Sequence, residues 1–568
     1  MTEPWWKHAL IYEIYPRSFA DSNGDGVGDL NGITEHLDYL EWLGVDALWL
    51  APMFPSPQVD FGYDISDYEA IDPMYGTLED FDRLQAKARE LQIRVVVDMV
   101  LNHTSDKHKW FLESASSRDN AKADWYVWDP GVPMDSRGVT EYQKKFGHEG
   151  MAPPNNWVSA FGGSAWEWVP ARRQFYYHFF YRQQPDLNWR NPAVEAAMFN
   201  MMRFWLDRGV AGFRLDAIPM LFEDPHLRNE EETGGVNEQG DPNLHRRYTY
   251  NLPQVHDVLR KLRSLADSYP GDPVVIGEVY SYDTAAVYTW YGGEAQDELH
   301  LPMDTLVGFG HSFLGQFPRF RAAHFRKYIQ EAATQLRGSR PLFVFDNHDN
   351  PRSIDRFGDG LHDTQIAKLI ATILLTTPAT AMTYYGAEIG MVTTTPTRKQ
   401  DVKDPIGITG WPKEKGRDGA RTPMQWTPGA QAGFSTNPHT WLPVAANYTK
   451  VNVETESADP DSLLNWNKRL VGLRRTEPAL HNGEIVLLDG ENADVLSYLR
   501  RTQDGRAAVI VSMNMSGQSQ TLALDLPNTE TRSNSPRVLA ATDKCLQAIT
   551  SLNLIVLPPF SALIVSLW

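Results

Sequence analysis

The sequence predicts an α/β fold: a (β/α)8, or TIM, barrel with an inserted subdomain after strand 3 and a C-terminal antiparallel β-sandwich domain. Three observations support this fold class. Eight short apolar runs alternate with helical periods, a long ring-rich segment separates the third run from the fourth, and short alternating strands begin near residue 482. The predicted domains are the barrel (1–103 and 180–481), the inserted B subdomain (104–179) and the C-terminal β domain (482–568).

The barrel strands are predicted from short runs rich in β-branched and other apolar residues. They are 9–15, 47–51, 94–100, 212–217, 274–279, 301–306, 342–346 and 379–385. Amphipathic stretches lie between them, for example Ile33, Leu37 and Leu40 before Gly44. In such barrels the chemistry sits at the C-terminal ends of the strands, so carboxylates there are the first candidates.

Three further segments have predicted roles around the barrel. In the inserted subdomain, most aromatic rings are expected to pack against one another, although some suit a sugar-facing wall. Segment 388–443 is predicted to cap the barrel mouth, and a helix at 462–475 to close the barrel. Segment 221–250, acidic in its middle, is predicted to be a helical lid that restricts substrate length.

Composition and charge narrow the function class. The 568 residues carry a net charge of −19, which disfavours nucleic acid and anionic membranes as partners and suits a small neutral ligand. A single cysteine excludes an intramolecular disulfide, and the N-terminal sequence lacks signal-peptide features, so we expect a cytoplasmic location. The longest apolar stretch contains Lys368 and Pro378 and does not resemble a membrane span. Oligomeric state is not predicted.

Two carboxylates lie at the ends of neighbouring predicted strands. Arg214 and Asp216 are two residues apart on one strand, hence on one face, and the arginine should keep the aspartate ionised. Glu278 ends the next apolar run. Glycoside cleavage requires one ionised and one protonated carboxyl group. A third acid, Asp349, follows the seventh strand beside His348, where it can stabilise positive charge at the anomeric centre.

At these residues the chain resembles a known family. DMVLNH (98–103), GFRLDA (212–217), GEVY (277–280) and NHD (347–349) are similar to the four short motifs of the α-amylase superfamily, glycoside hydrolase family thirteen. The resemblance extends to GVDALWLAP (44–52), YYGAEIGM (384–391) and ARTPMQW (420–426). QPDLNW (184–189) is similar to the α-glucosidase and oligo-1,6-glucosidase branch.

The resemblance implies roles for individual residues. Asp216 would be the nucleophile, Glu278 the general acid/base and Asp349 the stabiliser of the transition state. Asp64 would pair with Arg421 and hold the non-reducing end of the substrate, which closes the pocket and favours release of one terminal glucose. The other substrate-binding residues that we assign are Tyr63, His103, Phe161, Phe180, Gln184, Arg214, Ala217, His348 and Arg352.

A metal loop is predicted near the N-terminus. Segment 21–29 places oxygen-bearing residues at alternate positions, as calcium loops do, and the resemblance implies Asp21, Asn23, Asp25, the Val27 carbonyl and Asp29 as the ligands. The twelfth position holds a glycine instead of the bidentate glutamate of an EF-hand. Related α-glucosidases bind a structural Ca²⁺ or Mg²⁺ at a similar loop, and the alternative is a turn held by Asx hydrogen bonds. No organic cofactor is expected.

The resulting hypothesis is a retaining, exo-acting α-glucosidase that also transfers glucose to other sugars. Ala217 follows the nucleophile, and in resembling enzymes alanine or threonine there accompanies α-1,4 preference whereas valine accompanies α-1,6. A glucosyltransferase or isomerase of the sucrose isomerase or trehalose synthase type would share the glucosyl-enzyme. A non-catalytic sugar-binding or transporter-accessory protein is the remote alternative, because all three acids are present.

Overall fold

Eight parallel strands close into a barrel. The structure is a computed structural model that describes residues 3–311, 317–488, 492–524, 536–549, 552 and 554–567. The barrel strands are β1 (Leu10–Ile14), β2 (Ala47–Leu50), β3 (Arg94–Val100), β9 (Gly212–Asp216), β12 (Val274–Gly277), β13 (Leu301–Asp304), β14 (Leu342–Val344) and β15 (Thr380–Tyr384). They pair in the order β1-β15-β14-β13-β12-β9-β3-β2. All eight predicted strands and the predicted fold class are confirmed.

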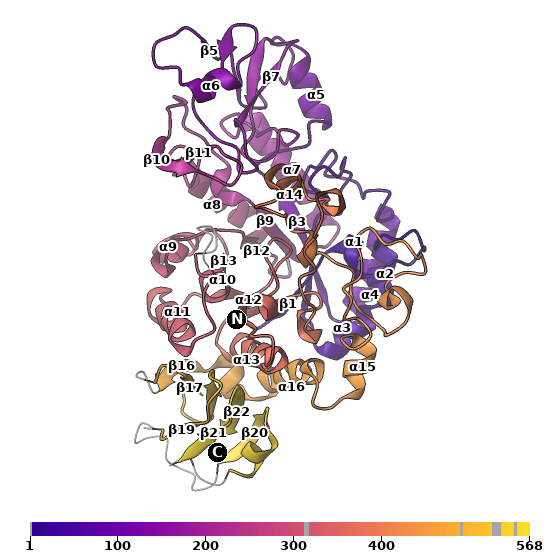
Figure 1. The fold of residues 1–568 in the computed structure, drawn as a ribbon, viewed down its shortest axis with the longest axis vertical. Helices are drawn as coiled ribbons and strands as arrows, with labels where there is room; N and C mark the ends of the chain where they lie inside the picture. Colours follow the sequence, from indigo (N-terminus) through magenta and orange to yellow (C-terminus); the bar gives the residue numbers. More distant parts are fainter. Residues whose placement is uncertain are drawn as a thin grey trace.

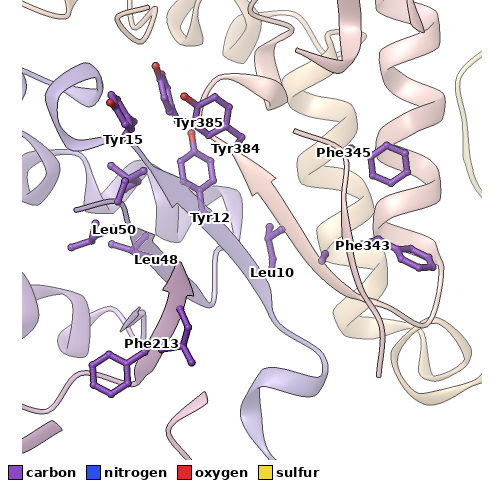
Figure 2. Close-up of a cluster of buried hydrophobic side chains, with 14 of the residues drawn as sticks. Leu10, Tyr12, Tyr15, Leu48, Leu50, Phe213, Phe343, Phe345, Tyr384 and Tyr385 are labelled. Carbon is purple, nitrogen blue, oxygen red and sulfur yellow. The ribbon is translucent and has the colours of Figure 1, made fainter. Parts of the chain in front are cut away.

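The side chains of β1 explain why the barrel strands appear as unbroken apolar runs in the sequence. Leu10, Tyr12 and Ile14 belong to the large cluster between the strands and the surrounding helices, whereas Ile11 belongs to the cluster inside the barrel. Figure 2 shows Leu10 and Tyr12 together with Leu48 of the neighbouring strand β2. Because a parallel sheet is covered on both faces, inward and outward positions are both apolar.

Helices surround the barrel (Figure 1). Those of the barrel region are α1 (Pro16–Phe19), α2 (Leu30–Glu35), α3 (Leu37–Leu43), α4 (Leu78–Glu90), α7 (Pro192–Asp207), α8 (Gln254–Asp267), α9 (Thr284–Thr289), α10 (Leu306–Phe309), α11 (Ala322–Gln335), α12 (Ser353–Phe357), α13 (Asp363–Thr376), α14 (Pro405–Gly410), α15 (Val453–Ala458), α16 (Leu463–Thr476) and α17 (Pro478–Asn482). Gly44 ends α3 in a left-handed conformation, and Thr77 begins α4 with a capping box to Asp80. Helix α16 confirms the predicted closing helix.

The inserted segment builds its own small sheets and core, and it forms the upper part of Figure 1. Its elements are α5 (Lys109–Ser116), β4 (Trp128–Asp129), β5 (Val132–Pro133), α6 (Glu141–Lys145), β6 (Met151–Ala152), β7 (Trp166–Val169) and β8 (Gln174–Tyr177). Trp157, Trp166, Trp168 and Tyr177 pack in one buried cluster. Most rings of the subdomain therefore serve its core, as expected.

The C-terminal domain is antiparallel, as predicted. Its strands are β16 (Glu484–Leu488), β17 (Val495–Arg501), β18 (Ala508–Asn514), β19 (Gln520–Leu522), β20 (Arg537–Ala541), β21 (Ile555–Leu557) and β22 (Ser561–Ser566). One sheet has the order β16-β17-β18-β22-β20, and β19 pairs with β21. Leu563 and Val565 of β22 face the cluster that includes Leu522 and Leu557, whereas Ile564 faces the barrel-side cluster.

The predicted helical lid at 221–250 is wrong. This segment contains a hairpin of β10 (Glu231–Val236) and β11 (Pro242–His245), with exposed side chains on β10. Gly234, Gly235 and Gly240 take positive φ angles, which suits turns and bulges and opposes a helix. Within the described part of the chain, no helix combines the length and apolar character needed to cross a membrane.

Candidate active site

A cavity of about 780 Å³ opens at the C-terminal ends of the barrel strands, beneath the inserted subdomain and the β10–β11 hairpin. The predicted residues that line it are Tyr63, His103, Phe161, Phe180, Gln184, Asp216, Ala217, Glu278, His348 and Asp349. Phe161 supplies a ring from the inserted subdomain, and Ile406 of α14 comes from the segment predicted to cap the barrel mouth. The cavity therefore brings the three predicted catalytic acids together.

Arg214 on β9 holds the first two acids in place. It is 1% exposed, and its Nη1 atom lies 2.7 Å from Oδ1 of Asp216. Its Nη2 atom lies 3.0 Å from Oε2 of Glu278, and Nη1 also contacts Asp98 at 3.1 Å. One planar guanidinium group thus bridges three carboxyl groups from β3, β9 and the end of β12. Asp98, which sequence reasoning did not assign, opens the DMVLNH motif.

The carboxyl groups around Arg214 outnumber its positive charge, which favours a protonated carboxyl group in this cluster. Burial raises the pKa of Asp216 well above its usual value, although Arg214 opposes the shift. Burial likewise raises the pKa of Asp98 to about 6. Because three carboxyl groups share one buried cation, we expect the cluster to hold at least one proton at neutral pH. The arginine alone does not set Asp216 in the ionised state that the sequence led us to expect.

Two buried histidines frame the same part of the cavity. Nδ1 of His348 lies 2.6 Å from Oε1 of Glu13, and its Nε2 lies 2.7 Å from the Tyr63 hydroxyl. Nε2 of His103 lies 3.1 Å from Nε2 of Gln184. Burial lowers the pKa of both His103 and His348 to about 3, so their imidazoles are neutral at physiological pH. Neutral rings suit hydrogen bonds to sugar hydroxyl groups.

The ion pair predicted between Asp64 and Arg421 is wrong. Asp64 is fully buried, and its carboxylate accepts hydrogen bonds from the Ser56 hydroxyl and from the amides of Val59 and Asp60. Asp64 does not line the cavity. Backbone and hydroxyl donors satisfy its oxygens, and burial raises its pKa to about 6.

The observed pair joins Asp60 and Arg417, both of which line the cavity. Oδ1 of Asp60 lies 2.7 Å from Nη2 of Arg417. Arg417 also contacts Asp404 at 2.8 Å and Asp349 at 3.0 Å. Sequence reasoning missed both residues, although each lies four positions before the residue that we had assigned.

Arg421 and Arg352 are buried supports at the edge of the site. Nη2 of Arg421 lies 2.9 Å from Oδ1 of Asp349, and its Nε donates to the His348 carbonyl at 2.8 Å. Burial opposes ionisation of Asp349, but His348 where it is protonated in acid, Arg417 and Arg421 outweigh it and hold its pKa below the usual value. At neutral pH the two arginines supply the positive charge. Arg352 donates to the carbonyls of Tyr385 and Ala420 and does not line the cavity.

Ala217 joins the two predicted catalytic strands. It follows β9 in a left-handed conformation with φ 49° and ψ 34°. Its amide nitrogen lies 3.2 Å from Oε2 of Glu278. A β-branched or bulky side chain is rare in this left-handed region, and the short side chain of Ala217 lines the cavity.

The predicted metal loop is held by hydrogen bonds between its own residues. Asp21 accepts the amides of Gly24 and Gly26, both at 2.7 Å, and Asp25 accepts the amide of Val27 at 2.8 Å. Asp29 caps α2 through the amide of Gly32 at 2.7 Å. Asn23 accepts the amide of Asp25 at 2.9 Å.

The oxygen atoms of this loop are hard donors, which suit Ca²⁺. Yet no group of three His, Cys, Asp or Glu side chains among the described residues is arranged to hold a metal ion. Ca²⁺ or Mg²⁺ at this loop stays a prediction.

Comparisons with known proteins agree with the fold and the motifs. The family model of the α-amylase catalytic domain matches residues 13–483. The chain is 40% identical over 542 residues to a probable α-glucosidase of Rhizobium meliloti (strain 1021), covering 93% of this chain and 92% of that protein. It is 37% identical over 552 residues to an oligo-1,6-glucosidase of Parageobacillus thermoglucosidasius, covering 92% of each.

Two solved structures are similar over the full length of both chains. An α-glucosyl transfer enzyme, XgtA, gives a TM-score of 0.85 at 37% identity. The trehalulose synthase MutB from Pseudomonas mesoacidophila MX-45 gives a TM-score of 0.87 at 34% identity. The barrel, the carboxylate cluster and these relatives define a glycoside hydrolase. The chain belongs to the α-amylase family, glycoside hydrolase family thirteen.

Proposed function

We propose that this protein is a retaining, exo-acting α-glucosidase that hydrolyses terminal α-1,4 bonds of short oligosaccharides and transfers some glucose to other sugars. The observation that carries the exo action is the ion pair between Asp60 and Arg417. It lies at the cavity wall beside Asp349, where it offers both acceptors and donors to the hydroxyl groups of one terminal glucose.

The proposed reaction proceeds in two steps. Asp216 attacks the anomeric carbon while Glu278 protonates the leaving oxygen, which gives a β-linked glucosyl-enzyme. Water or another hydroxyl group then attacks the anomeric carbon, Glu278 takes its proton, and the product regains the α configuration. Asp349, held ionised beside Arg417 and Arg421, would stabilise the positive charge that develops on the sugar.

The preference for α-1,4 bonds is proposed from Ala217. Ala217 lines the cavity, directly follows Asp216 and donates its amide to Glu278, so a larger side chain there would narrow the space for the leaving sugar. The similar proteins include an oligo-1,6-glucosidase, and linkage preference is therefore the first property to measure.

A glucosyltransferase or isomerase is the second candidate. Two of the similar solved structures are an α-glucosyl transfer enzyme and a trehalulose synthase, and both cover the whole chain. All of these reactions share the glucosyl-enzyme and differ in what accepts the glucose.

One experiment tests both candidates. Purified enzyme is incubated with maltose, isomaltose, sucrose and trehalose, and the products are followed over time by chromatography. We expect free glucose to be released fastest from maltose, and NMR should show α-glucose as the first anomer. Isomeric disaccharides without free glucose would support the second candidate, and β-glucose as the first product would refute retention.

A matched pair of variants tests the nucleophile. Asp216→Asn should lower kcat for maltose by at least about a thousandfold, because the covalent route is lost. Asp207→Asn, at the end of α7 and outside the cavity lining, should leave kcat unchanged. Unchanged glucose release by Asp216→Asn would reject the assignment.

A further inference from the structure

Tyr280 contacts one of the two carboxyl oxygens of Glu278, and both residues line the cavity. The Tyr280 hydroxyl lies 2.7 Å from Oε1 of Glu278. Oε2 of the same carboxyl group lies 3.2 Å from the amide nitrogen of Ala217 and 3.0 Å from Nη2 of Arg214. The two oxygens therefore have neighbours of different chemistry.

This difference decides which oxygen carries the acidic proton. The Ala217 amide and the Arg214 guanidinium can only donate hydrogen bonds, so a proton on Oε2 would point at two donors. The proton is therefore favoured on Oε1. A hydroxyl group both donates and accepts hydrogen bonds. Tyr280 can therefore accept a hydrogen bond from the Oε1 hydroxyl when Glu278 is protonated, and donate one to Oε1 when Glu278 is ionised.

Tyr280 is itself held at the cavity and kept protonated. The hydroxyl of Tyr250 donates to the carbonyl oxygen of Tyr280, and both tyrosines line the cavity with Glu278. Burial and the Glu278 carboxylate raise the pKa of the Tyr280 phenol well above its usual value. The phenol therefore stays protonated at neutral pH, where it can donate a hydrogen bond and does not act as a base.

We infer that Tyr280 is a positioning residue that fixes the carboxyl group of Glu278 with its proton-bearing oxygen, Oε1, facing the cavity. This inference rests on the proposed function, which makes Glu278 the acid/base. As the glycosidic bond breaks, the Oε1 proton moves to the leaving oxygen and Asp216 forms the new bond to the anomeric carbon. The Tyr280 hydroxyl then donates to the deprotonated Oε1. This hydrogen bond reverses when Glu278 takes a proton from the incoming water or sugar.

Substrates that differ in their need for a proton test this role. Tyr280→Phe removes the hydroxyl and keeps the ring. Maltose has a sugar leaving group that must be protonated, whereas α-glucosyl fluoride releases fluoride with little proton assistance. Losing a hydrogen bond to a charged group changes a rate constant by roughly tenfold to hundredfold. We expect Tyr280→Phe to lower kcat/KM for maltose by this factor. For α-glucosyl fluoride we expect a change below about threefold.

Tyr269→Phe is the matched control. The Tyr269 hydroxyl donates to Oδ1 of Asp207 at 2.8 Å, outside the cavity lining. This variant loses the same kind of bond, so kcat/KM for both substrates should stay unchanged. If Tyr280→Phe does not fold, Tyr250→Phe replaces it, because losing the bond to the Tyr280 carbonyl should give the same pattern with a smaller amplitude.

Two results would overturn the inference. One is an equal loss with maltose and α-glucosyl fluoride, which would mean that Tyr280 only shapes the pocket. The other is an unchanged kcat/KM for maltose. A wild-type enzyme that uses α-glucosyl fluoride but not maltose would contradict the proposed function alone. The same comparison with sucrose in place of maltose would then decide the role of Tyr280.

Discussion

Asp60→Asn separates the observed ion pair from the one that the sequence suggested. Asp60 contacts Nη2 of Arg417 at 2.7 Å and Nε2 of Gln184 at 3.0 Å. After the substitution Arg417 keeps Asp404 at 2.8 Å and Asp349 at 3.0 Å, so no buried cation is left without a carboxylate. We therefore expect the variant to fold.

The expected loss of activity follows from one charge-assisted hydrogen bond. Such a bond is worth about 1.5–3 kcal/mol, and each 1.36 kcal/mol changes a rate or binding constant about tenfold. If Asp60 binds the terminal glucose in the ground state and in the transition state, kcat/KM for maltose should fall by about tenfold to hundredfold, mainly through a higher KM.

The assay is glucose release from maltose, with Asp64→Asn as the comparison. Asp64 accepts three hydrogen bonds inside its loop. In Asp64→Asn the new NH2 group would face hydrogen-bond donors, and a buried polar group left without a partner costs about 1–3 kcal/mol. We therefore expect a lower Tm. Because Asp64 holds the loop that carries Asp60, a smaller fall in kcat/KM, about threefold, is also expected. Wild-type kinetics in Asp60→Asn, or a larger kinetic loss in Asp64→Asn below its Tm, would refute the assignment.

Three further predictions address linkage, metal and pH. Ala217→Val should raise the ratio of kcat/KM for isomaltose to kcat/KM for maltose, and an unchanged ratio would contradict the linkage proposal. It should also lower Tm, because a β-branched residue is strained at φ 49°. If the 21–29 loop binds Ca²⁺, adding Ca²⁺ after EDTA treatment should raise Tm in the wild type but not in Asp21→Asn, and no rise would reject the site. Burial raises the pKa of Asp304 to about 7, above its unfolded value of about 3.9, so its stability contribution is full below pH 4 and lost as pH rises to 7. The Tm of Asp304→Asn relative to wild type should therefore increase between pH 4 and 7, and a constant difference would contradict this shift.

The barrel was predictable because its signals are local. Each strand is buried on both faces, so it appears as an apolar run whatever its neighbours are, and β3 was predicted to the residue. The hairpin at β10 and β11 was not predictable from the acidic composition of its segment. Its conformation depends on Gly234, Gly235 and Gly240 at positive φ and on its position at the cavity wall. Neither feature produces a periodic pattern of apolar residues in the sequence.

The same distinction explains which site residues were found. Asp216 ends β9 and Glu278 directly follows β12, where strand alternation sets the direction of a side chain, so their meeting point could be inferred. Asp60 and Asp64 lie in a loop, four residues apart, as do Arg417 and Arg421. Between the two aspartates the backbone passes through positive φ at Phe61 (50°) and Gly62 (107°). That turn directs one carboxylate to the cavity and the other to backbone amides, so spacing alone offered two equivalent pairs and only the loop geometry distinguishes them.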